Sequence, residues 1–228
     1  MMHNWLAKAY GPQHWWPAET AFEVVVGAYL VQNTAWAAVE RSLSKLRSAG
    51  ALSIDGLRAL SLDNLRELIR PSGFYSRKAP ALKAFIAMLD AEFLGSLDIL
   101  AATQTEVLRD RLLALPGVGG ETADAILLYA LGHAVPVADE YLRRISERHR
   151  LVPPLQEKNR KGYEALVQLT REAFRKDALA DRPRLFNEFH ALTVAVGKKH
   201  CSARADCDGC PLVADLLINK LAPIRIKI

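Results

Sequence analysis

The chain has 228 residues, of which 50% are hydrophobic and 24% charged, so it is long enough to bury one large core or two smaller ones. Thirty Lys and Arg residues against 25 Asp and Glu residues give a net charge of +5, which suits a polyanionic partner without proving one. The sequence contains no apolar run near the ~20 residues that span a bilayer, and residues 1–11 lack the pattern of a signal peptide. We therefore expect a cytoplasmic protein with no membrane partner.

Apolar residues at helical spacing predict an all-α fold. The predicted helices cover residues 22–30, 35–46, 57–69, 78–93, 105–114, 121–131, 139–149, 162–176 and 183–196. No segment shows the strict alternation of apolar and polar residues that is typical of a β-strand.

A short glycine-rich turn separates the predicted helices 105–114 and 121–131. Its sequence is Leu115-Pro116-Gly117-Val118-Gly119. Gly117 and Gly119 permit a sharp turn and a close approach to a ligand, while Pro116 fixes the entry angle. The amides from Val118 to Gly120 would lie at a helix N-terminus, where partial positive charge favours an anion. We interpret residues 105–131 as a helix-hairpin-helix that holds a DNA phosphate; the alternative is an ordinary connection between two packed helices.

Several motifs in this order resemble one enzyme family, the helix-hairpin-helix DNA glycosylases related to endonuclease III. Within it, the 3-methyladenine DNA glycosylase III branch is most similar. The motifs are Leu115-Pro116-Gly117-Val118-Gly119-Gly120-Glu121-Thr122-Ala123-Asp124, Val137-Ala138-Asp139, His14-Trp15-Trp16-Pro17, Val31-Gln32-Asn33-Thr34-Ala35-Trp36 and Arg70-Pro71-Ser72-Gly73-Phe74-Tyr75.

The resemblance implies a two-lobed all-α glycosylase fold with an active-site cleft between the lobes. We expect a six-helix barrel over residues 21–134, which carries the hairpin, and a second lobe made from residues 1–20 and 135–228. The cleft would hold Asp139 on one side and Trp36 on the other. The expected partner is double-stranded DNA with damaged bases, bound by a monomer.

Asp139 matches the catalytic carboxylate of the family. Breaking an N-glycosidic bond develops positive charge on the sugar, and a nearby carboxylate stabilises that charge or orients the attacking water. The simpler interpretation is that Asp139 only caps the helix that comes after it, and capping is compatible with catalysis.

Glu121 stands where bifunctional family members carry a lysine. That amine attacks the sugar, forms a Schiff base and leads to strand cleavage, which a carboxylate cannot do. We therefore predict a monofunctional enzyme that uses water, unless a lysine elsewhere in the sequence substitutes.

Trp15, Trp16, Pro17 and Trp36 match the positions that line the pocket for the flipped base. An alkylated purine such as 3-methyladenine carries delocalised positive charge, which indole faces attract by about 0.5 to 2 kcal/mol per contact. The alternative is that these tryptophans belong to the core.

Gln32 and Phe74 match the side chains that fill the gap left when a base is flipped out. Phe74 is predicted to lie in an exposed turn; the alternative is burial. Arg70, Arg77 and Lys78 flank this turn and would contact phosphates, unless they form an ordinary solvated basic surface.

Cys201, Cys207 and Cys210 form a C-terminal loop, residues 201–210, that resembles the iron–sulfur loop of endonuclease III relatives. Four thiolates are the usual requirement, and the family spacing places Leu216 where the fourth would stand. We favour a degenerate loop and expect no required cofactor; a cluster or a zinc ion completed by His200 or another ligand is the alternative.

The predicted function is hydrolytic removal of alkylated purines in base excision repair. One alternative is a bifunctional endonuclease III-type enzyme for oxidised pyrimidines, and another is a non-catalytic DNA-binding module. As in relatives, the carbonyls of Leu113, Leu115 and Val118 would hold a monovalent cation at the hairpin.

Overall fold

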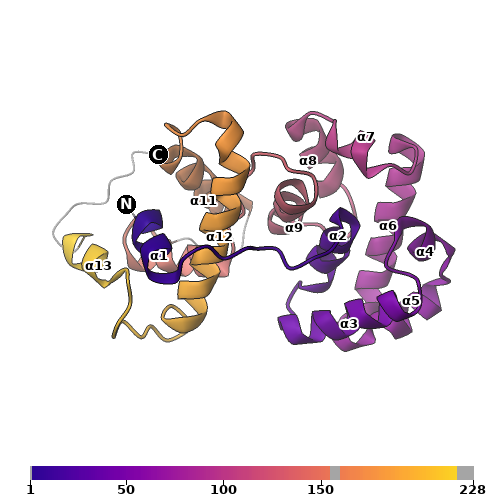
Figure 1. Cartoon of the computed structure of the whole chain (residues 1–228), viewed down its shortest axis with the longest axis horizontal. Helices are drawn as coiled ribbons and strands as arrows, with labels where there is room; N and C mark the ends of the chain where they lie inside the picture. The colour runs from indigo at the N-terminus through magenta and orange to yellow at the C-terminus, as the bar shows by residue number, and fades with distance from the viewer. Residues whose placement is uncertain (1, 155–159, 220–228) are drawn as a thin grey trace. The chain divides into compact units, whose positions relative to one another are not determined.

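The computed structural model describes residues 2–154 and 160–219. Throughout this part of the chain every regular element is helical, and no strand is found, which confirms the all-α prediction (Figure 1). The chain divides into two compact units, the first containing the described residues of Met1–Trp15 and Ala134–Ile228 and the second Trp16–His133. No helix in the described ranges has the length and apolar character needed to cross a bilayer.

The second unit contains α-helices, a 3-10 turn and a π-helical segment. They are α2 (Ala21–Leu30), α3 (Trp36–Ser48), α4 (Ile54–Ala59), α5 (Leu62–Ile69), η1 (Arg70–Ser72), α6 (Tyr75–Phe93), α7 (Leu97–Ala101), α8 (Thr105–Leu113), α9 (Gly120–Ala125) and η2 (Ile126–Ala130). Almost all of α2 is buried, and it packs against α3, α6, α9 and η2. The core of this unit therefore surrounds the helix that leads directly to Gln32 and Trp36.

The sequence predicted one helix over 57–69, and the structure corrects this to two. Leu57 and Leu65 both have 0% exposure, but they belong to α4 and α5 respectively. The chain turns at Leu60, which is extended, and the Ser61 side chain then accepts a hydrogen bond from the Asn64 amide to start α5. The leucines fit a helical repeat across the break because each short helix buries its own apolar face.

The described part of the first unit contains five α-helices. They are α1 (Met2–Tyr10), α10 (Glu140–Arg148), α11 (Arg160–Ala173), α12 (Arg182–Lys199) and α13 (Val213–Asn219), with the short turn η3 (Leu179–Asp181) before α12. The helix α12 packs against α1 and α10. One buried cluster joins Leu6 of α1, Ile145 of α10 and Leu192 of α12 to two of the cysteines. The start of α10, which carries Asp139, is thus fixed by the core of this unit.

Candidate active site

The hairpin lies between α8 and α9 in the second unit, as the sequence predicted. Gly117 has φ +75°, a conformation that disfavours other residues, whereas Gly119 is extended and is the N-cap of α9. Pro116, Gly117 and Gly119 are exposed, while Val118 is buried. The Val118 N–H donates to the Leu115 carbonyl oxygen at 3.2 Å, so in this state the amide is engaged within the turn.

Two contacts that the sequence did not reveal stabilise the hairpin. Arg109 of α8 and Asp124 of α9 form a buried bidentate ion pair, with N–O distances of 2.6 and 3.0 Å. The Gln32 amide nitrogen donates to the Gly117 carbonyl oxygen at 3.0 Å and to Thr122 Oγ1 at 2.8 Å. The half-buried Gln32 therefore lies against the hairpin, and its side chain is engaged on the protein in this state.

Phe74 forms the exposed turn that the sequence predicted. Its side chain is 58% exposed, and its backbone has φ +48°, immediately before α6 begins. Large exposed aromatic side chains on a left-handed backbone position are uncommon, and the surrounding structure must hold such a residue in place.

Lys78 differs from the expectation of a phosphate contact. It is buried, and its ammonium donates to the carbonyl oxygens of Leu30 and Ser72 and to Thr34 Oγ1, at 2.7 to 2.9 Å. Desolvation lowers the pKa of Lys78 to about 8. Lys78 therefore joins the end of α2 to the Phe74 turn, while Arg70 and Arg77 remain at the surface.

Trp16 and Trp36 meet edge to face, with ring centroids 5.3 Å apart. Tyr129, which the sequence analysis did not identify, adds a third ring at 5.3 Å from Trp16. A Cβ placed on Gly27 would come within 3.3 Å of the Trp16 ring, so a glycine at this position of α2 lets the indole pack closely. Trp36 also donates its indole N–H to Glu40 at 2.9 Å. Both tryptophans are partly exposed, so neither is fully enclosed in the core of this unit.

The other two predicted pocket residues have different surroundings. Trp15 belongs to the first unit, where the Lys198 ammonium lies 5.9 Å from its ring centroid. Pro17 is exposed and belongs to the second unit with Trp16.

Asp139 is the N-cap of α10, as the sequence suggested. Its Oδ1 accepts the Leu142 amide at 2.8 Å, and its Oδ2 lies 3.7 Å from Nε2 of His190 on α12. The Asp139 side chain is 10% exposed. The cap therefore uses only one of the two carboxylate oxygens, and the second faces His190.

The three cysteines lie around one cavity of about 240 Å³ in the first unit. Cys201 and Cys210 are buried and Cys207 is exposed, and all three are free thiols. Leu216 lines the same cavity, in agreement with its predicted place. Burial is the main cause of a raised pKa for the Cys210 thiol. Within the described residues, no three His, Cys, Asp or Glu side chains are grouped closely enough to hold a single metal ion.

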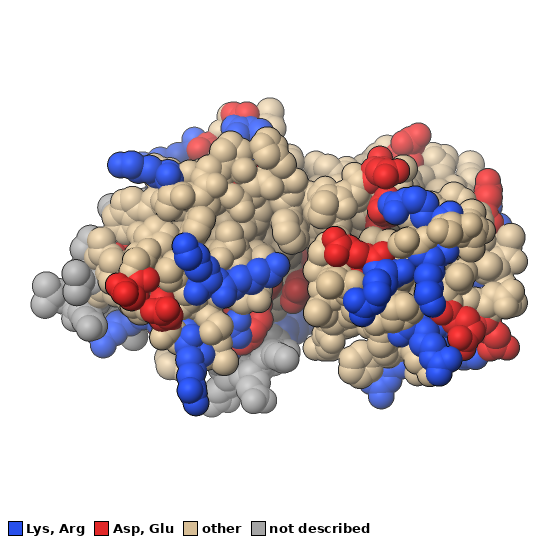
Figure 2. All heavy atoms as spheres, turned by 60° about the horizontal axis from the view of Figure 1, so that its bottom comes forward, with Lys and Arg blue, Asp and Glu red and all other residues tan. Residues whose placement is uncertain are grey.

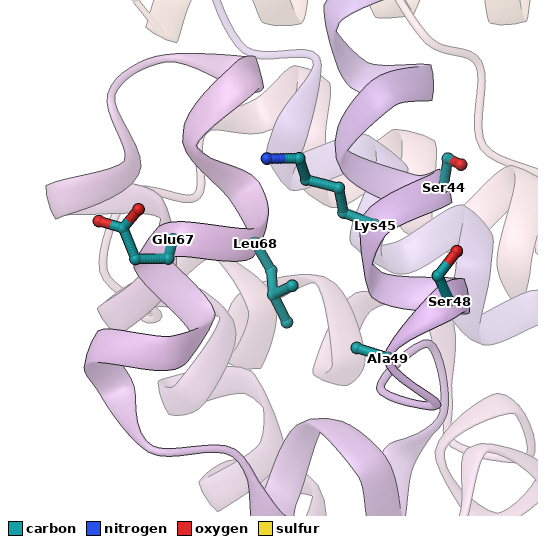
Figure 3. A pocket seen from close by; sticks show the side chains of 6 residues that line it. All are labelled: Ser44, Lys45, Ser48, Ala49, Glu67 and Leu68. Carbon is teal, nitrogen blue, oxygen red and sulfur yellow. The ribbon is translucent and has the colours of Figure 1, made fainter.

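A larger hollow, of about 490 Å³, lies between α3 and α5 of the second unit (Figure 3). It is lined by Ser44, Lys45, Ser48, Ala49, Glu67 and Leu68. Figure 3 shows Lys45 and Leu68 extending into the space from the two facing helices. This hollow contains none of the predicted site residues and no aromatic side chain.

Positive charge is not concentrated in one stripe on the face drawn in Figure 2. Lys and Arg side chains stand among Asp and Glu side chains there.

Comparison with known proteins places these features in a family. Residues 26–172 match the model of the HhH-GPD superfamily base excision DNA repair proteins. A protein of Methanocaldococcus jannaschii, named provisionally as a DNA repair glycosylase, is 41% identical over 205 residues, which cover 89% of this chain and 88% of that protein.

Two solved structures share the fold over most of the chain. The H. pylori 3-methyladenine DNA glycosylase bound to 1,N6-ethenoadenine has a TM-score of 0.71 and 28% identity, covering 85% of this chain and 92% of its own. A non-covalent endonuclease III–DNA complex has a TM-score of 0.73 and 21% identity, covering 96% and 94% respectively. The chain therefore belongs to the HhH-GPD superfamily of base excision repair proteins, and it is a DNA glycosylase.

Proposed function

We propose that this glycosylase excises alkylated purines, such as 3-methyladenine, by hydrolysis and does not cleave the DNA strand. The observation that carries the proposal is the side chain at position 121, an exposed glutamate in the first turn of α9. Bifunctional relatives use a lysine at the matching position, and a carboxylate cannot form the Schiff base that strand cleavage requires.

The aromatic group of Trp16, Trp36 and Tyr129 supports a cationic base as substrate. A methylated purine carries delocalised positive charge, and each ring face that it contacts contributes about 0.5 to 2 kcal/mol. The similarity to an H. pylori enzyme that is named for 3-methyladenine and was crystallised with another modified adenine points to the same class.

Asp139 is the proposed catalytic carboxylate. As the bond between the base and C1′ of the sugar breaks, the base keeps the electron pair and the sugar becomes positive. Oδ2 of Asp139 stabilises this charge, while the Leu142 amide holds Oδ1 in place. Water then adds to C1′ and loses a proton to the carboxylate, which leaves a free base and an abasic site. An alkylated purine is already a good leaving group, so one carboxylate suffices.

The proposed DNA contacts use the exposed residues of the second unit. Pro116, Gly117, Gly119 and Gly120 are proposed to bind a backbone phosphate, and Phe74 to fill the gap in the base stack. Gln32 would contribute to the same step only by exchanging its bonds to the hairpin for bonds to DNA. The proposed hairpin cation would use the remaining lone pairs of the Leu113, Leu115 and Val118 carbonyls.

Product analysis tests the proposal. The protein is incubated with a methylated duplex and, separately, with a thymine-glycol duplex, with and without alkali and borohydride. We expect free alkylated base from the first duplex, and a strand break only after alkali.

Other outcomes identify the alternatives. A strand break without alkali, together with a borohydride-trapped adduct, would show a lyase, and peptide mapping would then name its lysine. Binding to both duplexes with neither product would indicate a DNA-binding module.

A further inference from the structure

The side chain of Lys78 lies where three segments of the second unit meet. Only 4% of the residue is exposed, and its Nζ donates to the Leu30 carbonyl oxygen at 2.7 Å, to Thr34 Oγ1 at 2.7 Å and to the Ser72 carbonyl oxygen at 2.9 Å. An ammonium has three protons and no lone pair, so these contacts use its whole capacity for hydrogen bonds. One buried cation therefore connects the three segments.

These segments carry the side chains that are proposed to enter the DNA. Leu30 and Thr34 lie on either side of Gln32 in the sequence. Ser72 lies two residues before Phe74. Thr34 Oγ1 is also 3.0 Å from the Gln32 carbonyl oxygen and 2.6 Å from the Ser72 carbonyl oxygen. The hydroxyl and the ammonium thus connect two turns that are far apart in the sequence.

The same ammonium approaches the aromatic ring of Phe74. Nζ of Lys78 lies 5.8 Å from the ring centroid, a distance at which a cation is attracted to the face of an aromatic ring. The Phe74 carbonyl oxygen accepts the backbone amides of Arg77 and Lys78, both at 3.0 Å. The exposed ring, on its left-handed backbone, is thus held by the first turn of α6.

Separating the two turns would be unfavourable, because it would leave buried polar groups without partners. Ser72 is 1% exposed, and burial lowers the pKa of the Lys78 ammonium to about 8, so water does not readily replace these contacts. The segment around Gln32 and the turn of Phe74 therefore form one rigid body.

We propose that Lys78 is a positioning residue for base flipping, which holds Gln32 and Phe74 in register so that both meet the DNA in one step. This inference rests on the proposed function, in which these two side chains fill the gap left by an extruded base. Two turns that moved independently would each have to be ordered on the DNA. Connecting them beforehand removes that cost.

Excision by the full chain from two duplexes tests the proposal. In the first, a single methylated purine is paired; in the second, it lies opposite an abasic site, so it has no partner to lose when it is flipped out. At saturating enzyme, we expect Lys78→Met to slow single-turnover excision about tenfold or more from the paired duplex and less than about threefold from the other. A 2-aminopurine next to the lesion should brighten less on binding of the variant, because fewer lesions leave the stack.

Lys83 provides a matched control on the same helix. Burial lowers the pKa of its ammonium too. Its Nζ donates to the backbone carbonyl oxygens of Leu57, Arg58 and Leu60. Lys83→Met therefore removes a similar ammonium without a contact to Gln32 or Phe74. We expect this variant to lose stability in urea, but to keep the ratio of the two excision rates and the fluorescence change of the wild type.

Thr34 keeps the test decisive if Lys78→Met folds poorly, which circular dichroism would reveal. Thr34→Val removes the hydroxyl that connects the two turns, and it should show the same selective loss on the paired duplex. Thr34→Ser retains the hydroxyl and should restore the wild-type ratio of rates.

The fluorescence change separates this inference from the proposed function. A wild type that brightens the probe but releases no base would refute the proposed substrate, while a weaker signal from Lys78→Met would still support the positioning role. The inference is overturned if Lys78→Met slows both duplexes equally, if its fluorescence change equals that of the wild type, or if Lys83→Met shows the same selective loss.

Discussion

The two oxygens of the Asp139 carboxylate have different surroundings, and this difference allows capping and catalysis to be separated. Oδ1 accepts the Leu142 amide, whereas Oδ2 faces His190. An asparagine keeps an oxygen for the amide but loses the negative charge.

We therefore predict that Asp139→Asn slows base excision by about 10² to 10⁴-fold while the unfolding temperature changes little. Single-turnover excision from a methylated duplex and thermal unfolding measure the two effects. Asp139→Ala is the control, because it should lose the cap as well, at a cost of about 1 kcal/mol. An asparagine variant with full activity would contradict the catalytic role.

Lys78 makes the stability of the second unit depend on pH. Its folded pKa of about 8 is below its ordinary value of 10.5, so the unfolded chain binds more protons between these two values. The contribution of this residue to the free energy of unfolding is therefore lowest below pH 8 and rises as the pH rises toward 10.5.

Lys78→Met removes this titration, so we predict that wild type gains about 1 to 2 kcal/mol relative to the variant between about pH 7 and about pH 9.5. Urea denaturation of both proteins at the two pH values provides the measurement, and comparing the pair cancels the titration of other groups. Equal pH dependence of wild type and variant would show that the lysine is not perturbed.

At the scale of elements, the hairpin shows why its two glycines are not equivalent. Gly117 needs its positive φ for the turn, but Gly119 is extended, exposed and has no neighbour within 4 Å of where a Cβ would lie. Position 119 therefore accepts a side chain without strain, and its N-cap geometry suits both serine and aspartate.

Because position 119 accepts a side chain, two variants there can be compared that differ in charge but not in capping ability. We predict that Gly119→Ser and Gly119→Asp both unfold within about 1 kcal/mol of wild type, since both residues cap helices. Only the aspartate should weaken duplex binding strongly, by about tenfold or more, because its charge opposes the phosphate. Fluorescence anisotropy with a labelled duplex measures the affinity of each variant for DNA. Equal affinity of the two variants would exclude a phosphate at this turn.

The sequence predicted long helices well and short ones poorly. Periodicity identified α6 and α12 because each buries apolar side chains over several turns. It missed α1, α7 and α13, and it merged α4 with α5. Helices this short owe their stability to packing against distant residues, as Leu6 of α1 does against Ile145 and Leu192, and local patterns do not record such contacts.

At the scale of the whole molecule, the motifs predicted the family and a candidate catalytic carboxylate, but not the groups that support them. Tyr129 and His190 approach Trp16 and Asp139 from segments far away in sequence, so no spacing rule would find them. Lys78 shows the opposite error, because a lysine in a basic-looking turn proved to be buried. The cleft expected between the two lobes stays a prediction.

The π-helical segment η2 has a consequence for how such an enzyme could change its substrate. A π turn contains an additional residue compared with an α turn, and Tyr129, whose ring lies beside Trp16, belongs to this segment. Deleting one residue from η2 ahead of Tyr129 would rotate the downstream residues by about 100° around the helix axis and carry the phenol away from the indole. In the proposed base pocket, the number of residues in η2, and not only their identity, would therefore decide whether the phenol stands beside the indole.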